Sequence, residues 1–467
     1  MWARDDTVRQ TLRRWGAWLL PSVVMVVCLL ALIPLATGSL IGGLAAIALI
    51  VGVTSIGVVG FEGTAIGALV LGVALSPMDN LRPVGAISFV SLADVFLLVG
   101  IGCLLPIVFS KRWTLDPFFM VAVAGLTGTA LISSALADEP GASLNSVLRL
   151  VVGAMLLPLA FMIWRPGPTI LLLFAWSYLL GNVANFAASF TQGVGDGGRR
   201  IGFSTHPNIM GLCAMLAVGI AIVLWEVLPR RYGVYALMCG VLCLGSVWVS
   251  GSRAALVAAA AMVALYPVIS RSIVTAVALF GASLPVIFIA ARTILSGENV
   301  SDNAFGRLLG GGSAQGSDLE REMIAEVARG QFHDHPILGV GLADVLAAHN
   351  IYLQIAAAIG IIGLTFFVAM LGSVLLRCFS IDRRFMLLVL PCFGYVMIGA
   401  LTTIIWDRYV WCVLALPFLL PLRRETEDEA EQAQEAADGA DRADARHEAA
   451  ALRAQGDGAT AAPSGRR

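Results

Sequence analysis

The stretch PNIMGLCAMLAVGIAIVLWEVL, residues 207–228, decides the fold class of this chain. It carries a single charged residue, Glu226. A bilayer is crossed by about 20 consecutive apolar residues in a helix, so this stretch is long enough to span. Its apolar residues run on without the alternation typical of a β-barrel strand. Several similar runs follow along the 467 residues. The sequence therefore predicts an all-α polytopic integral membrane protein.

The composition supports this class. Hydrophobic residues make up 58% of the chain and charged residues 13%, whereas soluble domains average roughly 45–50% and about 25%. The formal net charge of −1 gives no basis for a nucleic-acid partner. The eight cysteines lie in or beside apolar runs, and we expect them to be small buried hydrophobes rather than a disulfide framework or a zinc cluster.

The length criterion gives about 12–14 transmembrane helices. We predict a cytoplasmic N-terminus at 1–16, a transmembrane domain at 17–422 and a disordered, acidic and alanine-rich cytoplasmic tail at 423–467. The predicted spans lie near 17–37, 40–60, 63–77, 85–109, 117–136, 143–164, 168–190, 207–228, 232–250, 254–270, 273–291, 350–376, 385–405 and 407–421.

The positions of the positive charges predict the topology. Cytoplasmic loops are enriched in arginine and lysine, and nearly every second loop of this chain is basic when the N-terminus is placed inside. The sequence thus predicts a multi-pass protein of the cytoplasmic membrane with both termini cytoplasmic. The outer side then receives 191–208, 250–253 and the long loop 292–349. The basic residues of the inner loops include Lys111, Arg165, Arg230, Arg271, Arg377 and Arg423.

The long outer loop contains a predicted amphipathic helix over SDLEREMIAEVARG, residues 317–330. Ser317 and Glu320 have the spacing of a capping box, and Gly330 is a stop signal. We expect this helix to lie on the membrane surface or against the outer ends of the spans. Its apolar face consists of Leu319, Met323, Ile324 and Val327.

Several arginines fall on the predicted outer side, against the usual charge bias. They are Arg199 and Arg200 before the span at 207, Arg253 at the start of the span at 254, and Arg321 in the long loop. Guanidinium groups pair bidentately with phosphate, and helix N-termini add positive potential. Together these arginines predict an anion site. The alternative for each one alone is contact with lipid headgroups or a nearby carboxylate.

Two histidines stand at predicted helix starts on the same side. His349 precedes Asn350, where the helix dipole disfavours an imidazolium, so a neutral imidazole can act as a general base. The alternative is that His349 and Asn350 cap the helix. For His206, followed by Pro207 and Asn208, a structural cap is favoured over catalysis.

No metal or other cofactor is expected. His333 and His335 lie two residues apart without a third ligand, which is a weak metal motif. Within the predicted spans, Asp94 and Arg149 are ionisable. Such residues usually pair with one another or line a polar cavity. We predict that they form an ion pair, with the lining of a substrate cavity as the second interpretation.

Three segments between about 195 and 375 resemble the O-antigen ligase / O-antigen polymerase family of polytopic glycan transferases. They are RRIGFSTHPNIMGLCAMLAVGIA (199–221), VSGSRAALVAAAAMVAL (249–265) and the segment 320–364. The last has the pattern P-x-x-G-x-G followed by H-N-x-Y-L-Q.

This resemblance implies a reaction. A glycan on an outward-facing polyprenyl diphosphate, such as undecaprenyl diphosphate, is transferred to the hydroxyl of a glycan or of a lipid-anchored acceptor. Arg200 and Arg253 would bind the diphosphate, assisted by Arg321. His349 would remove the acceptor proton, with Asn350 orienting it, and no metal would be needed.

Two alternatives remain open from the sequence. Within the enzyme class, a polymerase and a ligase of surface lipopolysaccharide or exopolysaccharide would use the same residues. In a different class, a transporter or lipid-linked glycan flippase would use intramembrane charges such as Asp94 and Arg149 along a path.

Overall fold

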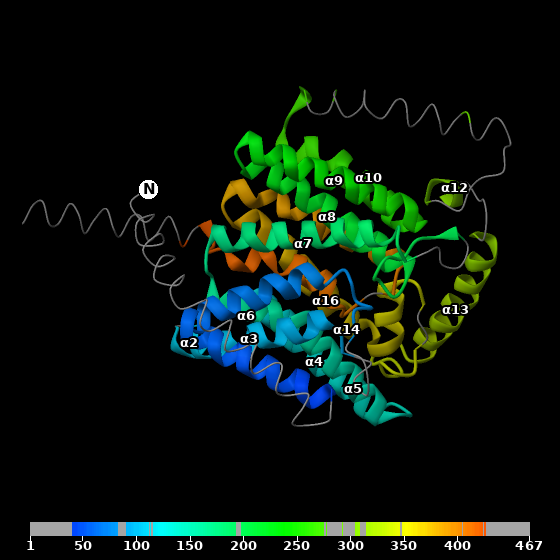
Figure 1. Ribbon diagram of the computed structural model, residues 1–467. Helices are drawn as coiled ribbons and strands as arrows, with labels where there is room; N and C mark the ends of the chain where they lie inside the picture. The colour runs from blue at the N-terminus through cyan, green and yellow to red at the C-terminus, as the bar shows by residue number, and fades with distance from the viewer. Residues whose placement is uncertain are drawn as a thin grey trace, which may run out of the picture.

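Every regular element that the structure describes is a helix (Figure 1), and the described residues contain no strand. The structure is a computed structural model. It describes residues 40–82, 90–111, 113, 115–192, 198–274, 277, 292, 304–308, 314–345, 348–403, 405–423 and 425.

Ten helical segments in this part of the chain are long and apolar enough to cross a membrane. The all-α polytopic fold is therefore confirmed. The segments are α2 (Leu40–Leu75, spanning from Thr54), α3 (Leu92–Ser110), α4 (Pro117–Ala135), α5 (Pro140–Leu150) continued by η1 (Val151–Met155) and α6 (Leu156–Trp164), α7 (Pro168–Ala188), α8 (Pro207–Val227), α9 (Arg230–Ser250), α10 (Arg253–Ser270), α14 (Ile351–Ser380), and η3 (Arg383–Leu388) with α15 (Val389–Ile398) and η4 (Gly399–Leu401).

The predicted spans correspond to these segments with a few differences. The spans predicted at 40–60 and 63–77 form one element, α2, interrupted at Gly60, where φ is 75°. The prediction at 17–37 and most of that at 273–291 lie outside the described residues. The prediction at 407–421 is present as two shorter helices, α16 (Arg408–Leu414) and η5 (Leu416–Leu419).

α8 is the central helix of the bundle. All of its residues from Met210 to Leu224 are buried, and it packs against α7, α9, α10 and α15. A helix that is apolar on all sides is expected in such a position. Gly219 allows close packing here, because a Cβ on it would lie 2.9 Å from Cδ of Pro391 on α15.

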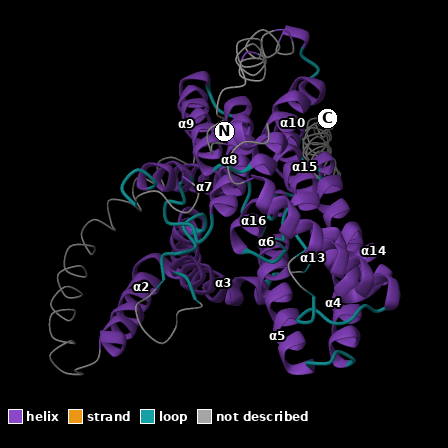
Figure 2. Ribbon diagram, turned by 90° about the vertical axis from the view of Figure 1, so that its right-hand side faces the viewer, coloured by secondary structure: helices purple, strands orange, loops and turns teal. Residues whose placement is uncertain are grey.

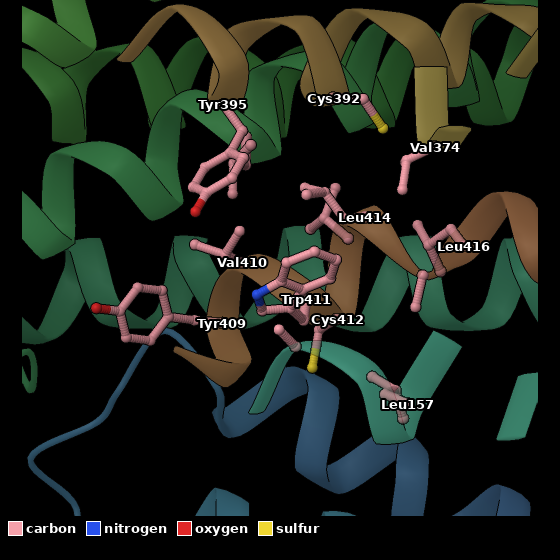
Figure 3. Close-up of a cluster of buried hydrophobic side chains, with 14 of the residues drawn as sticks. Leu157, Val374, Cys392, Tyr395, Tyr409, Val410, Trp411, Cys412, Leu414 and Leu416 are labelled. Carbon is pink, nitrogen blue, oxygen red and sulfur yellow. The ribbon is translucent and has the colours of Figure 1, made fainter. Parts of the chain in front are cut away.

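α16 also lies in the interior, and Figure 3 shows its side chains in a buried cluster. Its length of 7 residues is too short to span a membrane as a regular helix. Polar groups in such surroundings need internal partners, and Trp411 Nε1 accordingly donates to the Ile405 carbonyl at 2.9 Å. The labelled neighbours of α16 in Figure 3 include Leu157 of α6, Val374 of α14, and Cys392 and Tyr395 of α15.

α14 contains a break at Ile359 and Gly360, which have non-helical backbone angles. The break leaves backbone groups without helical partners, and the segment 336–341, which carries the P-x-x-G-x-G pattern, supplies them. The contacts are Val340 N to Ala357 O at 3.0 Å, Gly341 N to Ala358 O at 2.8 Å and Ile361 N to Pro336 O at 2.8 Å.

Three of the basic loops predicted on the inner side meet at one end of the bundle. Lys111 Nζ donates to the Trp164 carbonyl at 2.6 Å, and Arg377 at the end of α14 lies 3.6 Å from Asp116. Arg165 pairs with Glu425 at 2.6 Å. The start of α14 lies at the other end, beside α13 (Ala314–Asp334), as Figures 1 and 2 show.

Candidate functional site

A cavity open to solvent, with about 350 Å³ of empty space that includes the solvent at its mouth, lies at the α13 end of the bundle. It is formed where the start of α10 meets α13, η4 and the short helix α12 (Ala304–Leu308). Three arginines from three different elements face it. The lining residues are Asn208, Gly251, Ser252, Arg253, Ala254, Arg307, Arg321, Ile398, Leu401 and Thr402.

Arg253 is the first residue of α10. The Ser252 side chain caps this helix by accepting from Ala255 N at 3.4 Å, which fixes where the helix begins. The Arg253 guanidinium makes a bidentate pair with Asp318 of α13, with Nη1 3.0 Å from Oδ2 and Nη2 in contact with Oδ1. A guanidinium at a helix N-terminus is well placed for an anion because both contribute positive potential.

Arg307 and Arg321 complete the arginine lining. Arg307 is buried, at 3% exposure, and Nη1 donates to the Gly251 carbonyl at 3.1 Å. Arg321 Nη1 lies 3.8 Å from the same Asp318 carboxylate that pairs with Arg253. Burial lowers the pKa of Arg321, and the charge of Arg253 lowers it further. Electrostatic repulsion between these guanidinium groups makes an anion in the cavity favourable.

Arg307 was not predicted from the sequence. Its segment, NAFGRLL at 303–309, has no helical period and no neighbouring charge to mark it. The available signal was an arginine on the predicted outer side, the same signal that identified Arg253 and Arg321.

Arg199 and Arg200 do not line this cavity within the described structure. Arg199 is buried and connects helix ends, with Nε donating to the Ser250 carbonyl at 2.8 Å and Nη2 to Asn208 Oδ1 at 2.7 Å. Arg200 Nη1 donates to the Ser189 carbonyl at 2.8 Å. The Arg200 guanidinium also lies over the Phe190 ring, at the end of α7.

His206 caps α8. Its Nδ1 accepts from Asn208 N at 3.1 Å, in agreement with the structural interpretation favoured by the sequence. Burial lowers the pKa of this imidazole, followed by the charges of Arg199, His349 and Arg321. His206 therefore lies within the electrostatic influence of the arginine lining, although its cap already uses one ring nitrogen.

His349 directly precedes α14 and has a left-handed backbone, with φ of 52°. The cap of α14 is Asn350, whose Oδ1 accepts from Leu353 N at 3.1 Å. The imidazole is thus left out of the cap. Burial lowers the pKa of His349 and the Arg321 charge lowers it further, while Glu320 opposes them. The neutral imidazole dominates at pH 7, as a general base requires.

The predicted pair of Asp94 with Arg149 is wrong. α3 begins at Leu92, so Asp94 lies in the first turn, where it forms a capping box with Ser91. Its ionic partner is Arg408, whose Nε is 3.1 Å from Oδ1. Arg149 is exposed in the last turn of α5. Neither residue lines the cavity within the described structure.

The amphipathic helix of the long loop is present as α13, but with different ends. It begins at Ala314 and ends at Asp334, so Ser317 is not its cap and Gly330 does not stop it. At the C-terminal end, Ala328 and Phe332 pack against the core, and tertiary packing of this kind overrides the low helix propensity of Gly330. The predicted apolar face is divided: Leu319, Met323 and Val327 are exposed, whereas Ile324 packs partly against the core.

The part of the chain that the structure describes contains no group of three or more His, Cys, Asp or Glu side chains arranged to hold a metal. His333 and His335 are both exposed on the end of α13 and its following turn. His333 is 3.5 Å from Asp334.

Residues 238–368 match the family model described as O-antigen ligase. The family resemblance is confirmed. The matched segment includes the three arginines of the lining, Arg253, Arg307 and Arg321, and also His349. An enzyme that processes glycans in the manner of an O-antigen ligase is indicated, in a multi-pass membrane protein. No curated protein matches the chain.

Proposed function

We propose that this O-antigen ligase-like protein transfers a glycan from a polyprenyl diphosphate to an acceptor hydroxyl at the outer face of the cytoplasmic membrane. The observation that carries the proposal is the convergence of Arg253, Arg307 and Arg321 on one cavity. Three guanidinium groups from separate chain segments suit a ligand with several anionic oxygens, and a lipid diphosphate is such a ligand.

In this reaction the glycosidic bond from the anomeric carbon to the diphosphate oxygen breaks. The diphosphate leaves with the bonding electron pair, and the acceptor oxygen forms the new bond. Negative charge therefore grows on the leaving oxygen in the transition state. Arg253 and Arg321, both facing the cavity, would stabilise that charge without a metal ion, since preorganised positive groups are most effective where charge develops.

The acceptor hydroxyl must lose its proton as it attacks. His349 is the base we assign, because its lowered pKa keeps it neutral at pH 7 and its imidazole is not used by the helix cap. It lies at the N-terminus of α14, within the electrostatic influence of Arg321. Asn350 fixes the start of the helix and hence the position of His349.

Four further predicted residues would support this centre, and one of them, Asn208, lines the cavity within the described structure. Arg199 and Asn208 hold the segment before α8 against the end of α9. His206 caps α8 on the same side. Arg200, bound to Ser189 at the end of α7, would contact the lipid-linked donor from the side rather than within the arginine lining.

The test is complementation of a strain that lacks the gene. Surface glycan is resolved by gel electrophoresis, and protein levels are measured by immunoblot. Arg253→Gln and His349→Ala should each lower the glycan product by at least about 100-fold, as expected on removing a transition-state electrostatic group or a general base. Arg329→Gln is the matched control, because Arg329 is exposed on α13 and pairs only locally with Glu326 at 3.4 Å. Near-normal product from Arg253→Gln would refute the proposal.

The same strain separates a ligase from a polymerase. Loss of long chains with single repeat units still attached to the acceptor indicates a polymerase. Accumulation of long chains on the lipid carrier indicates a ligase.

A further inference from the structure

Two of the arginines that line the cavity already pair with an anionic group of the chain itself. The Asp318 carboxylate pairs bidentately with Arg253 and lies 3.8 Å from Arg321. This is the geometry with which a phosphate group binds a guanidinium. Arg253 lowers the pKa of the Asp318 carboxyl, so the side chain is ionised at neutral pH.

Asp318 lies in a short exposed stretch of α13, whereas the end of this helix is anchored. In the second half of the helix, Ala328 is 1% exposed, Phe332 packs against the core and Gln331 Nε2 donates to the Asp344 carbonyl at 3.0 Å. In the first half, Leu319 and Glu320 are exposed. The Asp318–Arg253 pair is thus a contact between an exposed stretch of α13 and the start of α10.

We propose that Asp318 is an internal competitor of the substrate diphosphate and sets the affinity of the cavity for its donor. This inference rests on the proposed function, since it assigns a role at the same cavity. A diphosphate that enters would displace the carboxylate from Arg253. The Asp318 side chain, already half exposed, would then turn toward solvent while α13 stays in place, and Arg253 and Arg321 would bind the ligand.

The pair is suited to displacement. The Asp318 side chain is 50% exposed, and exposed ion pairs contribute little net free energy. A diphosphate carries more charge than one carboxylate, and its oxygens can engage Arg253, Arg307 and Arg321 together. A single carboxylate or halide has neither advantage. Internal competition of this kind weakens the apparent affinity for the diphosphate. The apparent Kd equals the intrinsic Kd divided by the fraction of molecules in which the site is free.

The experiment uses the purified full-length protein in detergent and inorganic pyrophosphate as the probe, with binding measured by isothermal titration calorimetry. Asp318→Asn should bind pyrophosphate about three- to tenfold more tightly than the wild type, because the competing charge is removed. A purely structural ion pair would give weaker or unchanged binding on the same substitution. In the complementation strain, membranes with Asp318→Asn should reach half-maximal transfer at a lower donor concentration.

Glu326→Gln is the matched control. It removes one negative charge from the same helix and breaks a local pair, with Arg329, that lies away from the cavity. Its pyrophosphate affinity should equal that of the wild type. If the wild type binds pyrophosphate and Asp318→Asn binds no more tightly, the competitor role is overturned while the proposed function stands. If neither protein binds and Arg253→Gln still transfers glycan, the anion site and the competitor role fail together.

Discussion

Gly360 in the break of α14 lies directly against the carbonyl of Ile337. A Cβ on Gly360 would be 2.0 Å from that oxygen, and its φ of 70° is in the region that favours glycine. This contact is the centre of the junction between the 336–341 segment and α14. Since His349 lies between this segment and the break in the chain, we expect the junction to help position the imidazole.

Gly360→Ala should therefore disrupt both stability and activity. The backbone of Gly360, with φ of 70° and ψ of −174°, costs about 1–3 kcal/mol for a residue with a Cβ, and the clash with Ile337 forces the segment away from the helix. We expect a lower thermal unfolding temperature in detergent and at least about tenfold less glycan product.

The matched control is Gly372→Ala in the same helix. A Cβ at Gly372 would meet no atom within 4 Å, and alanine is favoured over glycine in a helix by up to about 1 kcal/mol. This variant should unfold at the same or a higher temperature and retain full activity. If the two variants behave alike, the junction does not position His349.

The sequence predicted the spans well because the bilayer imposes a length and an apolar composition that hydropathy measures directly. It did not predict the break in α14. The run from 351 to 376 is largely apolar and carries no charged residue, and a glycine within it is equally consistent with a straight helix. What decides the break is a separate segment, 336–341, that supplies hydrogen bonds to the freed backbone groups.

The site was predicted in part, for a related reason. Helix starts can be located from sequence, so Arg253 and His349 were identified by position. Side-chain partners are chosen in three dimensions, and the sequence predicted them poorly. Asp94 pairs with Arg408, which is 314 positions away, and Arg200 binds Ser189 rather than facing the cavity.

Arg307 is a candidate site residue that the structure identifies and the sequence did not predict. Arg307→Gln should reduce glycan product by about tenfold or more, because a buried guanidinium at the cavity is removed. Arg149→Gln is the control, since Arg149 is exposed on α5 and is not part of the lining. Equal product from the two variants, at equal protein levels, would exclude Arg307 from the site.

The Asp94–Arg408 pair makes a separate prediction about stability. Asp94→Ala removes both an ion pair and half of a capping box at the start of α3. We expect a loss of about 1–3 kcal/mol in the free energy of unfolding, the usual range for a hydrogen bond to a charged group. Arg149→Ala should leave the free energy of unfolding unchanged within about 0.5 kcal/mol. Chemical denaturation in detergent micelles measures both values. An equal loss from the two variants would contradict the assignment of Arg408, rather than Arg149, as the partner of Asp94.

The dependence of transfer on pH tests His349 as the base. A base must be neutral in the free enzyme, so kcat/KM should fall as the pH drops through the His349 pKa, which lies below the ordinary value. Arg321 lowers this pKa and Glu320 raises it. Arg321→Gln should therefore move the acid limb of the profile to higher pH, and Glu320→Gln should move it to lower pH.

The opposite directions of these two shifts are decisive, because a general loss of stability would shift the acid limb of both variants the same way. Profiles of transfer rate between pH 4.5 and 8, normalised to each variant's maximum, measure the shifts. Acid limbs that coincide in all three proteins would show that another group accepts the proton.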